Sequence, residues 1–483
     1  EKGSIKMNAT MKKTLNIILG PLAFALMMLI PFGGLDSSAR GAIGLLLWML
    51  LWWIMQPVAP AVTALLPILI AQLFKIAETK TVLATYFNAT VVLLLSANII
   101  TLAWTKWGFD RRLALNIMMR VGNNPRKLII MWFVLSVVLS SCVANAAVAA
   151  ALFPIVLTTI HAANITDDKI AESNYATMAL LAVAWGSNVG FGTPLGGAMN
   201  LVVVNLIEGY TGTEMMYVDW IVRVVPLVIF VSVPMIILLL TNKIEFKELP
   251  GTREALQAEL KAMGKMNRGE KISAILFIGA FVLSLARPLF QTLLPTLTAN
   301  YIFLLAALLC FVLPGEERKP VLEWGWSMPR IKWGVFLLIA GGTALGNIIT
   351  SSNVGSMIAS LLTPIAGKGP FAAIVVFSIL GCFFANIMTI TGCIALIGPI
   401  VITTMTSLGY NPIPFLLLVY ASCNISICLP SSGAGPAMVS GYGANMNKMV
   451  KWGLKTVPAC LISSIVLGYL LYLIWPGFSV IGL

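Results

Sequence analysis

The protein has 483 residues, of which 59% are hydrophobic and only 10% are charged, and its formal net charge is +13. A soluble domain carries about 25% charged residues, and a mean hydropathy of +0.94 leaves too few polar groups to cover a water-exposed surface. Apolar runs of about twenty residues recur along the whole chain, each long enough to cross a bilayer as a helix. The composition therefore predicts an all-α polytopic membrane protein and excludes a soluble one.

The basic residues do not indicate a nucleic-acid partner. They cluster in short loops between apolar segments, as the positive-inside rule expects, and no soluble basic domain is present to bind nucleic acid. All seven cysteines lie in apolar segments and are interpreted as small buried hydrophobes. Without a Cys/His cluster we expect no metal site and no cofactor.

The first part of the chain contains four expected spans and a basic stretch. The spans lie near residues 16–34, 40–56, 58–74 and 84–105. The basic stretch, GFDRRLALNIMMRVGNNPRK (108–127), mixes apolar residues with arginines. This mixture is typical of an amphipathic helix that lies in the membrane interface.

Two long blocks complete the first half, and the second half repeats the same order. The first half continues with the blocks 128–160 and 175–207, a span at 221–241 and the largest polar loop, 242–271, expected in the cytoplasm. The second half has spans near 272–291, 298–314 and 333–350, a weaker amphipathic piece (351–367), blocks at 369–406 and 412–444, and a last span at 454–476. We therefore expect about eleven transmembrane helices.

The blocks 128–160 and 369–406 are each too long for one span and too short for two. Each has a polar centre and reaches a proline soon afterwards, Pro154 or Pro399. The polar residues are Ser140, Ser141 and Asn145 in the first block, and Thr389, Thr391 and Cys393 in the second. We interpret each block as a re-entrant helical hairpin, because non-helical backbone at membrane depth must be buried in protein or line a wet cavity.

The blocks that follow the hairpins are interrupted in the middle. The stretches WGSNVGFGTPLGGAMN (185–200) and ICLPSSGAGPAMVSGYG (427–443) contain glycines and prolines that break helices. Each lies at a similar distance beyond its hairpin, which indicates an internal repeat. Paired interrupted segments in a membrane chain point to the binding site of a transporter.

The distribution of charge predicts that the two repeats are inverted. With the N-terminus in the cytoplasm and the C-terminus outside, the first hairpin opens inward and the second outward. All but six of the 31 Lys and Arg residues then lie on the inner side; the exceptions are Arg40, Lys75, Lys80, Arg223, Arg287 and Lys368. The outer loop 208–220 carries Glu208, Glu214 and Asp219 and no base, which agrees with this orientation.

The predicted organisation follows from these segments. Residues 1–39 form an N-terminal segment with the first span, 40–241 the first repeat, 242–271 the loop and 272–476 the second repeat. We expect the hairpins and broken helices to form a transport domain and the other spans to form a scaffold.

The residue types missing from the spans exclude several functions. No expected span contains Asp or Glu, which argues against a carboxylate proton relay and leaves an intramembrane enzyme without a general base. The polar residues concentrate at one depth, whereas an anion channel needs a continuous polar path. The remaining alternative is that these residues only pack helices together.

These features resemble the divalent anion/sodium symporter (INDY-type) family of di- and tricarboxylate transporters over nearly the whole chain. The stretch GTPLGGAMN (192–200) resembles the family's TPxGxPPN, and the hairpins match its Ser-Asn-Thr tips. Counting back from the prolines places the tips at Ala144-Asn145-Ala146 and Thr389-Ile390-Thr391. The chain thus lacks several of the family's polar residues.

The resemblance implies a secondary transporter that moves the site across the bilayer as an elevator, in a homodimer. The substitutions Ala144, Ala146 and Ile390 at the tips, with Ala385 nearby, remove oxygens from the family's two sodium sites. We therefore expect a sodium-independent exchanger of dicarboxylates in a bacterial inner membrane. A sodium-coupled symporter and a carrier of arsenite or a metal–citrate complex remain alternatives.

The expected substrate-binding residues come from both repeats. Asn145, Thr389 and Thr391 are expected to hydrogen-bond the substrate carboxylates, while Ser140 and Ser141 support the first tip or donate directly. The residues expected to shape the two breaks are Gly192, Thr193 and Pro194 in the first and Ser431, Ser432 and Gly433 in the second.

Overall fold

The computed structural model describes residues 9–30, 35–249, 251–316, 319–352, 354, 364, 368–387, 389–429 and 433–481. Within them the chain forms helices and no named strand, so the all-α expectation is confirmed. Eight helices of this described part are long and apolar enough to cross a membrane, or nine if one bent pair is a single span. The sequence predicted about eleven because several apolar segments form helices shorter than a full span, such as α16 and α22.

The first quarter of the chain, in its described part, contains seven helices. They are α1 (Ala9–Leu29), α2 (Ser37–Met55), α3 (Pro60–Thr63), α4 (Leu66–Leu73), α5 (Thr79–Tyr86), α6 (Ala89–Trp107) and α7 (Phe109–Met118). The expected span 58–74 is divided between α3 and α4, and Pro60 and Pro67 each lie in the first turn of one of them. Proline fits the first turn of a helix and not its interior, so this segment is two short helices.

The middle of the chain contains the first hairpin and the first broken helix. Its helices are α8 (Pro125–Cys142), α9 (Asn145–Ala162), α10 (Asn174–Asn188), α11 (Ala198–Thr211), α12 (Tyr217–Leu240) and α13 (Thr252–Ala262). Asn124 starts α8 because its side chain accepts the N–H groups of Arg126 and Lys127. The loop expected at 242–271 is partly helical, because α13 lies within it.

The last part of the chain contains the second hairpin and the second break. Its helices are α14 (Arg268–Leu285), α15 (Arg287–Phe290), α16 (Ala299–Val312), α17 (Trp324–Ser327), α18 (Trp333–Ser351), α20 (Pro370–Ile387), α21 (Ile390–Ser407), α22 (Pro412–Cys423), α23 (Ala434–Val439) and α24 (Met446–Ile474). Most of the expected amphipathic piece 351–367 lies outside the described residues.

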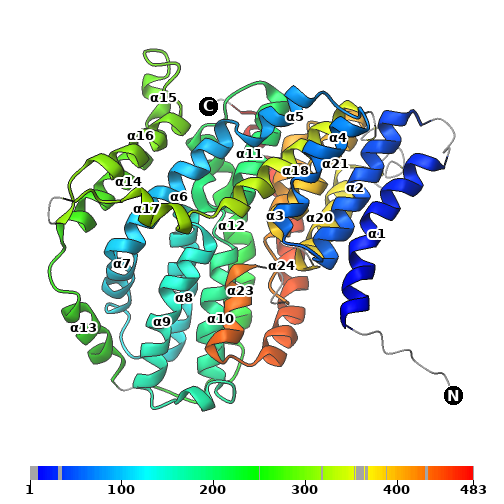
Figure 1. Ribbon diagram of the computed structural model, residues 1–483. Helices are drawn as coiled ribbons and strands as arrows, with labels where there is room; N and C mark the ends of the chain where they lie inside the picture. The colour runs from blue at the N-terminus through cyan, green and yellow to red at the C-terminus, as the bar shows by residue number, and fades with distance from the viewer. Residues whose placement is uncertain are drawn as a thin grey trace, which may run out of the picture.

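Segments from the two halves are interleaved in space. Figure 1 shows α23, from the C-terminal half, beside α9 and α10 from the N-terminal half, and it contacts both. The pairs α8 with α10 and α20 with α22 pack in the same way, each placing the first arm of a hairpin against the first half of a broken helix. Each hairpin thus packs against a broken helix, and this packing positions the candidate site.

The acidic loop predicted at 208–220 is shorter than the sequence predicted. Helix α12 begins at Tyr217, so Asp219 lies in its first turn and is 1% exposed. Its carboxylate accepts a hydrogen bond of 3.0 Å from Arg223, one turn later. The predicted boundary between the loop 208–220 and the span 221–241 was wrong. A paired Asp and Arg neutralise each other and can lie in a membrane helix, whereas an isolated charge cannot.

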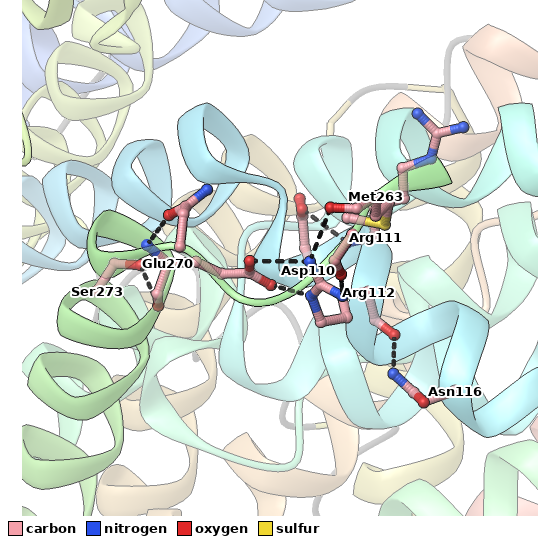
Figure 2. Close-up of polar contacts among 9 residues, drawn as sticks. Asp110, Arg111, Arg112, Asn116, Met263, Glu270 and Ser273 are labelled. Carbon is pink, nitrogen blue, oxygen red and sulfur yellow. Dashed lines mark hydrogen bonds and ion pairs between the residues drawn. The ribbon is translucent and has the colours of Figure 1, made fainter. Parts of the chain in front are cut away.

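A polar cluster attaches α7 to α13 and α14. Figure 2 shows the guanidinium of Arg112 close to Glu270 and to Met263, whose carbonyl it contacts at 3.4 Å. The guanidinium also donates to the carbonyl of Gly264 at 2.8 Å. The second guanidinium contact to Glu270 is 3.2 Å, and the Glu270 side chain is 1% exposed. The neighbouring Arg111 forms a more exposed pair with Glu259 at 2.9 Å. The bidentate pair is the stronger attachment because it is desolvated and geometrically fixed.

This difference gives a stability prediction. Arg112→Ala leaves the buried Glu270 carboxylate without its partner and should cost about 3–5 kcal/mol of stability. Arg111→Ala removes an exposed pair and should cost less than about 1 kcal/mol. Thermal unfolding of the two purified variants compares them directly. Equal losses in both would show that the buried pair does not hold α7 in place.

Candidate substrate-binding site

The first hairpin tip is fixed to the first broken helix by side-chain to backbone hydrogen bonds. The Ser140 hydroxyl lies 2.6 Å from the carbonyl oxygen of Ser187 and 2.7 Å from the side-chain oxygen of Asn145. Both oxygens are acceptors, so they share the single hydroxyl proton of Ser140. Ser140 therefore joins both arms of the hairpin to α10.

The next residue of the tip holds the interrupted backbone itself. The Ser141 hydroxyl accepts the N–H of Gly192 at 3.2 Å and donates to the carbonyl of Val137 at 2.8 Å. The Thr193 hydroxyl donates to the carbonyl of Ser141 and accepts the N–H of Leu195 at 3.3 Å. These hydroxyls satisfy backbone groups that the break leaves without helical partners.

The tip and the break approach so closely that only glycine fits between them. A Cβ added to Gly190 would lie 2.2 Å from the Cβ of Ser140. One added to Gly196 would lie 2.0 Å from the carbonyl oxygen of Gly190 and 2.6 Å from that of Ser140. The glycines of this stretch are therefore required for packing the hairpin on the broken helix.

The second hairpin is fixed to its broken helix by one asparagine. Asn386, near the end of α20, donates to the carbonyls of Cys382 at 2.9 Å and Ile425 at 3.3 Å. Its amide oxygen accepts the N–H groups of Ile427 and Cys428, both at 3.2 Å. Asn386 hydrogen-bonds backbone groups of the second break, as Ser140 and Ser141 do at the first.

Two asparagines missed by the sequence analysis connect the two halves. Asn188, at the end of α10, donates to the carbonyl of Ser426 in the second break at 2.7 Å. Asn200, in α11, donates to the carbonyl of Thr193 at 2.6 Å and accepts from the Tyr420 hydroxyl of α22. Polar side chains are costly in apolar segments. The presence of Asn188, Asn200 and Asn386 in apolar segments was therefore the sequence signal that could have identified them as functional.

Four of the expected binding residues lie at or next to the start of a helix. Asn145 is the first residue of α9, and Thr389 is the N-cap of α21, where its hydroxyl accepts the N–H of Gly392 at 3.2 Å. Thr391 is 9% exposed, in the first turn of α21. Gly433 directly precedes α23 and is half-buried.

Several other expected residues have structural partners or lie elsewhere. Gly192, Thr193 and Pro194 form the buried first break, where the Thr193 hydroxyl is engaged with the tip. Ser431 and Ser432 lie outside the described residues. Four residues are expected to replace oxygen-bearing residues of the family's sodium sites. They are Ala144, the N-cap of α9; Ala146 in α9; Ala385 in α20; and Ile390, which begins α21.

The electrostatics of the tips come from helix ends. Helices α9 and α21 begin at the two tips and α11 begins at the first break, and helix N-termini carry partial positive charge. No Lys or Arg stands in the segments 140–146, 187–200 and 385–394. An anion held there would be bound by N–H and O–H donors rather than by an ion pair.

A large cavity lies away from the tips. It has a volume of 510 Å³ and is lined by α5, α11, α18 and α21, with Asn205 3.4 Å from the Thr343 hydroxyl. Its lining has hydroxyl and amide groups but no charged side chain. It lies where elements of the expected transport domain face elements of the expected scaffold.

Comparison with known proteins assigns the chain to a family. Residues 11–481 match the family described as the sodium:sulfate symporter transmembrane region. The chain is 27% identical to the sodium-dependent dicarboxylate transporter SdcS of Staphylococcus saprophyticus, over 95% of this chain and 91% of that protein. It is 26% identical to SdcS of Staphylococcus aureus, over 96% of this chain and 91% of that protein.

A solved structure shares the fold. The crystal structure of the Alcanivorax borkumensis YdaH transporter, described as having an unusual topology, superposes with a TM-score of 0.51 at 12% sequence identity. The likeness covers 97% of this chain and 98% of that one. It supports the expected fold class.

The glycine packing gives a prediction for the first tip. Gly190→Ala places a methyl group 2.2 Å from Ser140, so the tip must move away from the break, at a cost of about 1–3 kcal/mol. Gly279→Ala in α14 is the matched control, because its Cβ meets no atom within 4 Å. Melting temperatures of both variants test this, and an unchanged value for Gly190→Ala would contradict the packing described here.

Proposed function

Because the chain belongs to the sodium:sulfate symporter family, we propose that it is a secondary transporter that exchanges dicarboxylates, such as 2-oxoglutarate, malate and succinate, without sodium. The substrate class is supported by its relatives, two of which are named dicarboxylate transporters. It is also supported by helix N-termini and neutral donors at the tips, which suit carboxylates.

One observation carries the proposal of exchange. At the second tip, Ala385 and Ile390 have no side-chain oxygen, and both acceptor positions of the Asn386 amide oxygen are used by backbone N–H groups. These side chains offer no oxygen for a sodium ion at this tip. An exchanger returns across the membrane with substrate bound, so it needs no ion gradient to drive it.

The substrate would be held between the two tips. Asn145, Thr389 and Thr391 would hydrogen-bond its carboxylates, with the N-termini of α9 and α21 supplying positive potential. Ser140 and Ser141 would act mainly by fixing the first tip, since their hydroxyls are already bonded to backbone carbonyls.

The proposed mechanism is an elevator. The hairpins and broken helices would move as one transport domain against a scaffold made of the other spans, in a homodimer. The repeats would occupy residues 40–241 and 272–476, with the N-terminus in the cytoplasm of a bacterium and the C-terminus outside its inner membrane. The packing of α23 against α10 supports a single moving body that contains both repeats.

Sodium-coupled symport is the second candidate. It is favoured by the printed names of the relatives, which are sodium-dependent transporters. It is also favoured by two buried amide oxygens, of Asn188 and Asn424, that have no hydrogen-bond partner in the described part of the chain. Carbonyl-type oxygens at broken helices can hold a cation.

Transport by purified protein in liposomes separates the two candidates. Vesicles are preloaded with unlabelled succinate, and uptake of labelled dicarboxylate is followed with sodium or choline outside. Exchange predicts uptake that needs internal substrate and ignores sodium. Uptake into empty vesicles that requires sodium would replace the exchanger with the symporter.

The role of the first tip has its own test. Asn145→Ala should reduce uptake at least about tenfold while the protein stays folded, because a substrate hydrogen bond in a dry site is lost. Asn116→Ala, in the exposed part of α7, is the matched control and should transport normally. Wild-type uptake by the Asn145 variant would show that the tip serves only packing.

A further inference from the structure

We propose a binding site for the headgroup of an anionic phospholipid on the segment 321–333, which lies between α16 and the start of α18. The last turns of α6 and α16 contact this segment, and the segment leads directly into α18. The site is separate from the hairpin tips. The proposal does not depend on which anion the protein carries or on how transport is driven.

The beginning of the segment is held in a fixed position by hydrogen bonds to two helices. The carbonyl oxygen of Val321 accepts the Lys106 ammonium at 3.1 Å and the Trp107 indole N–H at 3.0 Å, both from the end of α6. The N–H of Leu322 donates to the carbonyl of Cys310 in α16 at 2.8 Å. Val321 and Leu322 are buried. The packed start of the segment therefore fixes the position of the residues that follow it.

The residues that follow form a surface suited to the membrane interface. Helix α17 and the turn after it are bent by 54° from α18, so they do not continue its span in the same direction. Ser327 and Ile331 are buried, whereas Trp324, Met328 and Trp333 are 58%, 41% and 40% exposed. Tryptophan is enriched where lipid headgroups meet the acyl chains. The exposed side of the segment therefore lies at the level of the headgroups.

Another tryptophan holds two cations beside this surface. The Lys106 ammonium lies 5.2 Å and the Arg330 guanidinium carbon 4.3 Å from the centroid of the Trp326 ring. Such contacts orient a cation and leave its charge in place. Lys332 adds a third positive charge, and none of the three cations pairs with a carboxylate in the described part of the chain. Glu323 is the acidic residue of the segment, so the surface has a net positive charge.

The cations and the exposed aromatic rings together define the class of ligand. Arg330 donates through Nη1 to the carbonyl of Trp326 at 2.7 Å, and its other N–H groups have no partner among the described residues. A guanidinium binds phosphate oxygens in pairs, and basic clusters at a membrane surface attract anionic lipids. The exposed tryptophans would contact the first methylene groups of the lipid, which a free phosphate ion lacks. A zwitterionic headgroup brings an ammonium group that the same cations repel.

Thermal unfolding of the full-length protein in a neutral detergent tests the site. Phosphatidylglycerol is added to the micelles and compared with phosphatidylcholine that has the same acyl chains, at the same concentration. At about ten times Kd, phosphatidylglycerol should raise the melting temperature by about 1–3 °C above the value in phosphatidylcholine. Soluble glycerol phosphate is measured separately and should give no such rise, because it has no acyl chains to contact the tryptophans.

Two variants make the test specific. The double variant Arg330→Gln with Lys332→Gln should lose the difference between the two lipids, because it removes the cations that would contact the phosphate. Lys265→Gln, which removes an exposed basic residue from the loop after α13, should keep the difference. Each variant is compared with itself in the two lipids, so a general loss of stability in the double variant does not obscure the result.

Several results would overturn the proposal. One is an equal melting temperature of the wild type in the two lipids. Another is a difference that survives in the double variant, which would place the lipid elsewhere, or that disappears in Lys265→Gln, which would assign it to the overall surface charge. An equal rise with glycerol phosphate would make this a site for a soluble phosphate. Transport activity is not needed for any of these outcomes, so failure here is distinguishable from failure of the proposed function.

Discussion

The structure depends on one constraint: backbone groups released by a broken helix inside a bilayer must find partners within the protein. The first break is satisfied by Ser140, Ser141 and Thr193, which hydrogen-bond the backbone across the tip. At the second break, the Asn386 amide contacts the backbone of Ile425, Ile427 and Cys428, and Asn188 donates to the carbonyl of Ser426. The hairpins therefore exist together with the broken helices, because neither element can be stable in lipid without the other.

This constraint also separates structural residues from residues that can bind a ligand. A hydroxyl or amide already committed to the backbone has little capacity left for a substrate or an ion. At the first tip, hydroxyls bond the backbone and the Asn145 side chain is bonded to Ser140 and not to the backbone. At the second tip, the Asn386 amide bonds the backbone, and the Thr389 hydroxyl accepts the N–H of Gly392 but keeps its proton to donate. The two hairpins are thus held in the same way by side chains of different chemistry, and this difference is the basis for proposing exchange without sodium.

The sequence predicted the elements whose signals are local. The hairpins and breaks were found because prolines, glycines and hydroxyl residues interrupt apolar runs, and the structure places helix ends at 142–145 and 387–390. Asn188 was missed because its partner, Ser426, is 238 residues away, and no local pattern encodes such a pairing. Asp219 was assigned to a loop because a carboxylate is costly in a span, but Arg223 one turn later removes that cost. The substrate-binding roles of the tip residues stay predictions.

Asn188 has a consequence for how the chain can change over time. Its amide donates to the second break, and a Cβ on Gly433 would lie 2.5 Å from its side-chain oxygen. A single residue at the end of α10 therefore fills space and satisfies backbone at a break that lies more than two hundred residues later in the chain. A larger side chain at position 433 would meet Asn188. The residue at either position thus restricts which residues the other can hold.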